Sequence, residues 1–182
     1  MALLEIVEHP DKRLKRMCKP VEEVTEDLKK LAADMAETMY DAPGIGLAAP
    51  QIGESMRMVV IDVSGPDEEA ALYTLINPVI VEKEGDTSYE EGCLSVPGTF
   101  EEVKRAAEVG LDYLDLDGNK QHLKADGLFA ICIQHEIDHL DGKLFIDRIS
   151  GLKRKLAVRK MERFKKERAK QMMENESNNY GS

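Results

Sequence analysis

The hydrophobic positions of this chain follow a helical period in three segments. In the first segment, Thr25 stands where a helix N-cap is expected. The residues after it place apolar side chains three and four positions apart, at Leu28, Leu31, Ala32, Met35 and Met39. This spacing puts them on one face. We therefore predict an amphipathic helix from Thr25 to about Tyr40, stopped by the turn-forming residues 41–44.

The other two helical segments lie in the last third of the chain. Residues 128–140 form the second, with Asp126 as its N-cap and Gly142 as its stop. The third begins after residue 151 and carries apolar side chains among many basic ones, at Leu152, Leu156 and Phe164. Residues 175–182 are polar, and we expect them to fray.

Short runs typical of strands fill the middle of the chain. We predict strands over residues 58–63, 74–81, 89–96 and 103–116, and a return strand over 120–124 after the turn Asp117-Gly118. Residues 44–51 are predicted to form a tight loop. This order favours an α+β fold over a wound parallel sheet. Antiparallel strands would pack around the central helix 128–140, with an N-terminal helix and a C-terminal basic helix.

The composition fits a globular protein. The chain has 182 residues, of which 42% are apolar and 33% charged, so it can bury a core. No apolar run reaches the roughly 20 residues that a transmembrane helix needs. The first residues lack a basic stretch followed by a long apolar one, so we expect no signal peptide. The three cysteines, Cys18, Cys93 and Cys132, are then expected to be reduced thiols in the cytoplasm.

The net charge of −10 conceals an asymmetry along the chain. Residues 152–170 hold ten basic residues against two acidic ones, a charge of +8, which leaves −18 for the remainder. A basic arm on an acidic body favours a polyanionic partner, such as RNA, or a membrane surface. An equally strong alternative is a solvated helix whose charges offset the acidic body.

Residues 134–139, Gln-His-Glu-Ile-Asp-His, carry the strongest chemical signal. In a helix, His135 and His139 project from nearly the same face and can ligate one metal ion. Glu136 can then act as the base for a water molecule at that metal. The same side of the helix carries an apolar wall, formed by Leu128, Ile131 and Cys132. The alternative is a set of core residues whose histidines are satisfied by hydrogen bonds.

Two histidines are rarely enough to hold a metal, so a third ligand is expected. Zinc peptidases with this motif take it from downstream, where this chain has only scattered acidic candidates and no histidine. Upstream, Cys93 follows Gly92 in a predicted strand, and a thiolate is a strong ligand for a borderline-soft metal. One cysteine and two histidines would leave a fourth position for water, as in catalytic sites. Cys93 taken alone would more often be a small buried hydrophobe.

Three segments together are more specific than each is alone. They are residues 44–51 (Gly-Ile-Gly-Leu-Ala-Ala-Pro-Gln), 91–95 (Glu-Gly-Cys-Leu-Ser) and 134–140 (Gln-His-Glu-Ile-Asp-His-Leu). In this order they closely resemble the three motifs of the peptide deformylase family. The resemblance covers most of residues 1–150. It implies a catalytic domain over 1–150, with the basic helix and polar tail of 151–182 as an extension of the same domain.

The resemblance also implies a reaction and a role for each site residue. The family hydrolyses the formyl group from the N-terminal formyl-methionine of newly made polypeptides and releases formate. The implied metal ligands are Cys93, His135 and His139, and Glu136 would transfer protons. The Gln51 side-chain amide and the Leu94 backbone N–H would stabilise the oxyanion.

The implied substrate contacts fall into three groups. The backbone at Ile45 and Gly46 would pair with the peptide like an added strand, and Gly92 would also contact the substrate. Arg105 matches a family position near the substrate, with a plain surface charge as its alternative. The methionine pocket would be lined by Leu128, Ile131 and Cys132.

The donor set suits several divalent ions. Its ligands and geometry would fit Zn²⁺, Fe²⁺, Ni²⁺ or Co²⁺. From the resemblance we expect one Fe²⁺ per chain in the cell, and Zn²⁺, Ni²⁺ or Co²⁺ as alternatives in a purified sample.

Two other functions stay open on the residues alone. One is an endopeptidase with a downstream third ligand, and the other is a non-enzymatic binding module with a closed, structural metal.

The expected partners are nascent formyl-methionyl polypeptides and, through the basic helix, the ribosome, with no membrane. Truncation at Gly151 is expected to weaken ribosome binding in a salt-dependent manner and to leave peptide turnover nearly intact.

Overall fold

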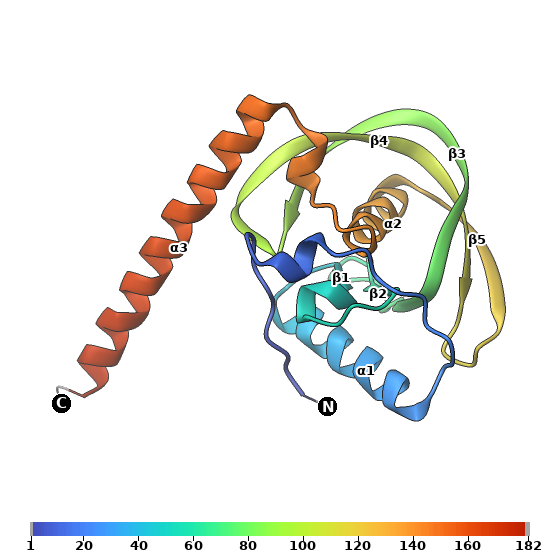
Figure 1. The fold of residues 1–182 in the computed structure, drawn as a ribbon, viewed down its shortest axis with the longest axis horizontal. Helices are drawn as coiled ribbons and strands as arrows, with labels where there is room; N and C mark the ends of the chain where they lie inside the picture. Colours follow the sequence, from blue (N-terminus) through green and yellow to red (C-terminus); the bar gives the residue numbers. More distant parts are fainter. Residues whose placement is uncertain (1, 181–182) are drawn as a thin grey trace.

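Five strands form one antiparallel sheet in the order β1-β2-β3-β4-β5 (Figure 1). The structure is a computed structural model that describes residues 2–180. The strands are β1 (Gly46–Ala48), β2 (Met58–Ile61), β3 (Tyr73–Cys93), β4 (Val96–Leu114) and β5 (Lys120–Asp126). The same residues contain the helices α1 (Glu26–Asp41), α2 (Gly127–Leu140) and α3 (Gly151–Asn179). The α+β prediction is confirmed.

β3 and β4 form a long, curved hairpin that arches over α2 (Figure 1). Its tip is the turn at Leu94 and Ser95, between the paired residues Cys93 and Val96. The prediction of two strands over 74–81 and 89–96 was wrong. The intervening segment is polar and exposed, yet it continues the strand because its backbone pairs with β4. The predicted strand 103–116 likewise starts earlier, at Val96.

Residues 44–51 are only partly the loop that their glycines predicted. Gly46–Ala48 pair with β2 as β1, and Ala49–Ile52 form a short 3-10 helix. β1 lies at one edge of the sheet. It therefore brings a short stretch of backbone with an unpaired side close to α2.

The helices α1 and α2 begin and end close to their predicted residues. The Thr25 hydroxyl accepts a hydrogen bond from Leu28 N (3.2 Å), and the apolar side of α1 packs against β1 and β2. Asp126 precedes α2 as predicted, but its side chain makes no capping hydrogen bond. Ten of the fourteen residues of α2 are buried. Most polar side chains on α2 must therefore find partners inside the protein.

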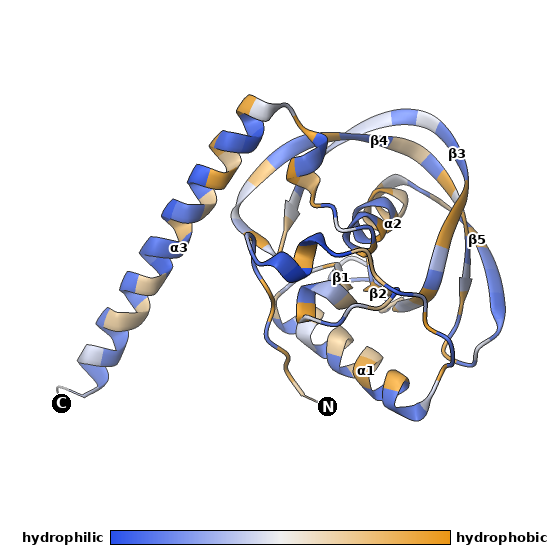
Figure 2. Cartoon of the chain, in the orientation of Figure 1, coloured by the Kyte–Doolittle hydropathy of each residue, from blue (hydrophilic) through white to orange (hydrophobic). Residues whose placement is uncertain are grey.

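α3 is the most hydrophilic of the helices and extends along one side of the body (Figure 2). Its buried residues, Ala157 and Met161, pack in a cluster with Val96, Val103 and Phe145. No helix in residues 2–180 has an apolar stretch long enough to cross a membrane.

The fraying predicted for residues 175–182 was wrong as far as Asn179, where α3 ends. The segment 171–176 contains good helix formers, among them methionine and glutamate, and these continue the helix without tertiary support. Residues 181–182 of that prediction lie outside the described residues.

Candidate metal centre

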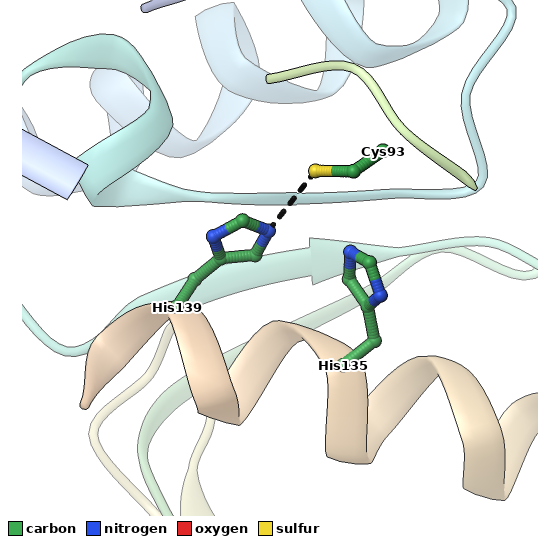
Figure 3. A group of neighbouring side chains, drawn as sticks. All are labelled: Cys93, His135 and His139. Atoms are coloured by element: carbon green, nitrogen blue, oxygen red, sulfur yellow. Dashed lines mark hydrogen bonds between the residues drawn. The ribbon is translucent and has the colours of Figure 1, made fainter. Parts of the chain in front are cut away.

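The tip of the β3–β4 hairpin brings Cys93 to the face of α2 that carries His135 and His139 (Figure 3). One donor atom from each residue lies within 4.8 Å of the other two, and Cys93 Sγ is 3.3 Å from His139 Nε2. Tetrahedral ligation at 2.0–2.3 Å separates ligand atoms by roughly 3.5 Å. The three donors therefore fit a single ion, and a thiol with two imidazoles suits a borderline-soft divalent metal.

The buried surroundings act differently on the two histidines. Glu91 Oε1 lies 2.8 Å from His135 Nδ1, so this nitrogen donates a hydrogen bond and Nε2 keeps its lone pair. Burial alone would lower the pKa of His135, but the neighbouring Glu91 and Cys93 raise the pKa overall, so metal binding must displace a proton here. Burial lowers the pKa of His139, which favours the neutral imidazole that a metal needs.

The carboxylate that orients His135 belongs to a buried ion network. Arg105 on β4 donates hydrogen bonds from Nε and Nη2 to Glu91, both at 2.8 Å, and from Nη1 to Asp138 on α2 at 2.6 Å. Arg148 donates two further hydrogen bonds to Asp138, at 2.7 and 3.1 Å. Burial works to raise the pKa of Glu91, but Arg105 and His135 hold it below its usual value. The network ties β3, β4 and α2 together behind the metal ligands.

Arg105 does not lie where it was expected. Its side chain is only 4% exposed, so it is not a plain surface charge. Its guanidinium is occupied by Glu91 and Asp138, and it does not line the cavity in front of the metal ligands. The geometry supports a positioning role in place of a substrate contact, because Arg105 fixes Glu91 and, through it, His135.

Glu136 lines a cavity of about 600 Å³ that also reaches Cys93 and His135. Its Oε2 is buried without a hydrogen-bond partner in residues 2–180. Burial raises the pKa of Glu136 to about 7, which suits a group that accepts and returns a proton near neutrality. Gly46 approaches it closely, since a Cβ there would lie 2.6 Å from Glu136 Oε1 and 2.9 Å from Cys132 Sγ. A side chain at position 46 would displace the glutamate.

Gln51 is fixed at both ends of its amide. Its Oε1 accepts a hydrogen bond from Ala48 N at 2.9 Å, and its Nε2 donates to Ser95 Oγ at 3.1 Å. The same Nε2 lies 3.6 Å from Cys93 Sγ, and the residue is 1% exposed. An amide N–H held in this way can donate to an oxyanion that forms beside the metal ligands. Leu94, at the hairpin tip, also lines the cavity.

The cavity brings together the remaining residues expected at the substrate. Its walls include Ile45, Gly46, Gly92, Leu128, Ile131 and Cys132. Other wall residues were missed, among them Tyr89, Phe100, Phe164 and Arg168. Glu91 was missed as well, although its place two residues before the expected thiolate ligand was a signal that could have been used. Phe164 and Arg168 gave no such signal, because no local pattern shows where an exposed helix docks.

A cysteine and two histidines that can hold one metal, with a buried glutamate beside them and a cavity in front, define a metal-dependent hydrolase. The family model described as "Polypeptide deformylase" matches residues 3–155. A peptide deformylase of Mesorhizobium japonicum is 53% identical over 170 residues, which cover 93% of this chain and 97% of the relative.

Solved structures agree with this match. A peptide deformylase from Legionella pneumophila has a TM-score of 0.87 at 48% identity, covering 92% of this chain and 98% of that one. A peptide deformylase from Ehrlichia chaffeensis in complex with actinonin has a TM-score of 0.85 at 42% identity, covering 90% and 98%. The chain belongs to the peptide deformylase family, metal-dependent hydrolases that remove the N-formyl group from newly made polypeptides. This confirms the resemblance and decides against the endopeptidase and the binding module.

Proposed function

We propose that Cys93, His135 and His139 hold one divalent metal ion, Fe²⁺ in the cell, and that the formyl-methionine end of a nascent polypeptide enters the cavity in front of it. The observation that carries the proposal is the buried Glu136, whose Oε2 has no hydrogen-bond partner within residues 2–180, beside three converging donor atoms. Zn²⁺, Ni²⁺ or Co²⁺ would occupy the same donors in purified protein. Residues 1–150 form the catalytic domain, residues 151–182 extend it, and the reaction takes place in the cytoplasm.

In the proposed reaction, Glu136 transfers protons, and Gln51 and Leu94 stabilise the oxyanion. When bound, the metal lowers the pKa of water and polarises the formyl carbonyl. Glu136 accepts a proton from the water whose oxygen adds to the formyl carbon. The Gln51 side-chain amide and the Leu94 backbone N–H donate to the resulting oxyanion, and losing one such donor typically costs about 2.7–4 kcal/mol. As the C–N bond breaks, Glu136 passes the proton to the leaving amine, and formate departs.

β1 provides the binding edge for an extended peptide. Gly46 pairs with Ile61 of β2 on one side, and Ile45 and Gly46 line the cavity on the other. A peptide can pair with this free edge as an added strand, with its formyl group directed toward Glu136. The methionine side chain then packs against an apolar wall on α2, made of Leu128, Ile131 and Cys132.

Formate release measured beside bound metal tests the proposed function. The protein is prepared anaerobically with Fe²⁺ and incubated with formyl-Met-Ala-Ser, with unformylated Met-Ala-Ser as the blank. We expect one ion per chain and formate in proportion to the bound iron. A fully loaded protein that leaves the formylated peptide intact would contradict the proposal.

The basic face of α3 supports a contact with the ribosome as a second part of the proposal. The half-buried basic residues Arg154, Lys165 and Arg168 pair with acidic residues of the body. The other basic residues of 152–170 are exposed, namely Lys153, Lys155, Arg159, Lys160, Arg163, Lys166 and Lys170. Such a row suits the phosphates of ribosomal RNA, and the contact would hold the cavity near emerging chains.

Charge neutralisation on α3 should weaken ribosome binding without disturbing the body. The helix variant replaces four exposed residues with glutamine: Arg159, Lys160, Arg163 and Lys166. The control removes the same charge from the body, at Lys83, Lys104, Lys120 and Lys124. In co-sedimentation at low salt we expect the helix variant to bind roughly tenfold more weakly than the control, with the difference shrinking as salt rises. Equal binding of the two variants would refute the contact.

Truncation at Gly151 is a poor test of this contact. It was expected to leave peptide turnover nearly intact, which treats the helix as separate from the body. The structure packs Ala157 and Met161 of α3 into a hydrophobic cluster and places Phe164 in the cavity wall. Truncation would therefore expose the cluster and change the cavity together with the charge.

A further inference from the structure

α3 reaches the cavity in which the reaction takes place. Phe164 and Arg168, one turn apart on α3, line the same cavity as Cys93 and Glu136. Figure 1 shows α3 passing along the side of the body where β4 begins, and its buried residues pack there against Val96. The helix therefore contributes part of the wall that a bound peptide would meet.

Phe164 is held in place by the backbone of Gly98 and by the side chain of Arg168. Its ring lies on the backbone at Gly98, which has a φ of +78° and no room for a Cβ beneath the phenylalanine. The guanidinium of Arg168 lies 5.7 Å from the ring centroid, over the ring. Glu8 holds that guanidinium through two hydrogen bonds of 2.8 and 2.9 Å. Phe164 is nevertheless 41% exposed, so part of its ring stays open at the cavity.

A second aromatic ring lines the same cavity, at a place where the β3–β4 ladder is irregular. Glu91 pairs with Glu101 and Cys93 with Val96, so the four residues 97–100 lie opposite Gly92 alone. The extra residues form a bulge, so residues 97–100 leave the regular pairing and line the cavity. Phe100, the last of them, is 62% exposed. Two large apolar side chains thus remain uncovered at one cavity, which is typical of a binding surface.

Glu8 engages both basic side chains at this end of the cavity. Arg168 makes a bidentate ion pair with Glu8, and Lys165 Nζ lies 3.5 Å from the same carboxylate. Because Glu8 already pairs with the Arg168 guanidinium, this group is not free to attract an acidic side chain of a ligand. The surface left for a ligand then consists mainly of the exposed parts of the Phe100 and Phe164 rings, which favours an apolar group.

We propose that Phe164 is a specificity-determining residue and that, with Phe100, it forms an apolar subsite. The subsite takes the side chain of the second or third residue of the nascent chain, after the formyl-methionine. This inference rests on the proposed function, because it assumes a peptide that enters along β1. Nascent chains with leucine or phenylalanine at that position are the preferred substrates.

Two peptide series test the subsite. They are formyl-Met-X-Ser and formyl-Met-Ala-X, with X as Ala, Leu, Phe or Glu, and kcat/KM is measured for each. At one of the two positions we expect wild type to prefer Leu and Phe over Ala about tenfold, as a partly open apolar pocket allows. Phe164→Ala should reduce this preference to about twofold, and Phe164→Leu should keep most of it. The ratio between peptides does not depend on the fraction of protein that is folded.

A matched control lies on the same helix. Met172 is 60% exposed on α3 and does not line the cavity, so Met172→Ala should leave both kcat/KM values and their ratio unchanged. A Phe164→Ala variant that keeps the wild-type preference would overturn the inference. A wild type that prefers Glu, or that shows no preference, would overturn it as well. A metal-loaded wild type that hydrolyses none of the peptides would overturn the proposed function, and this inference with it.

Discussion

The Glu136→Gln variant is expected to lose formate release by roughly a thousandfold while it keeps its metal. Glutamine has the shape of the glutamate but cannot accept the proton of the attacking water. Glu136 is not one of the three donors Cys93, His135 and His139, so the metal site should stay intact. Its buried Oε2 has no partner among residues 2–180, so the substitution breaks no hydrogen bond of that atom.

Three measurements make this result interpretable. Bound metal per chain and the midpoint of thermal unfolding should match wild type, and formate release from formyl-Met-Ala-Ser should not. Glu54→Gln serves as the control, because Glu54 is exposed and lies outside the cavity. If Glu136→Gln turned over like Glu54→Gln, another group would have to transfer the proton.

The second large effect is expected from Cys93→Ser, which should lose both metal and activity. A serine hydroxyl stays protonated and is a poor ligand, so two histidines would be left to hold the ion. Changes of residues that only support metal ligands already lower affinity by 10–100-fold, and removal of a ligand should cost at least about 100-fold. Metal content after dialysis, measured together with formate release, checks the expectation.

Cys18→Ala provides the matched control for this variant. Cys18 is also buried, but it lies in the hydrophobic cluster with Leu75 and Leu140 and does not line the cavity. Its removal should lower stability slightly and leave one metal ion per chain. Full metal content and turnover in Cys93→Ser would show that the third ligand lies elsewhere, as in the endopeptidases that share the helical motif.

Local patterns predicted the parts of the molecule that local rules govern. The boundaries of α2 were predicted from Asp126, an apolar period and Gly142, although Asp126 makes no capping hydrogen bond. The spacing of His135 and His139 follows from the helix itself. Cys93 was found by asking which residue could complete such a site. Its actual placement depends on a hairpin turn at Leu94 and Ser95, which the predicted strand 89–96 ran through.

The features that the sequence did not reveal depend on pairing between distant segments. The middle of β3 is polar and exposed, and only its partner β4 makes it a strand. Arg105 was expected near the substrate from the family resemblance, or else at the surface, because arginine is seldom fully buried without carboxylate partners. Those partners, Glu91 and Asp138, come from two other elements. The periodicity of one segment does not show which side chains of distant segments will contact it.

The short length of β1 has a consequence for the behaviour of the protein at high concentration. An open sheet edge can template the addition of strands from other molecules and so lead to aggregation. β1 has only three residues, so it can hold one short peptide but gives a neighbouring sheet little backbone to pair with. The opposite edge strand, β5, carries Lys120 and Lys124, whose charges discourage such stacking. The free edge of β1 is thus long enough to pair with a short substrate peptide but offers little backbone for pairing between copies of the protein.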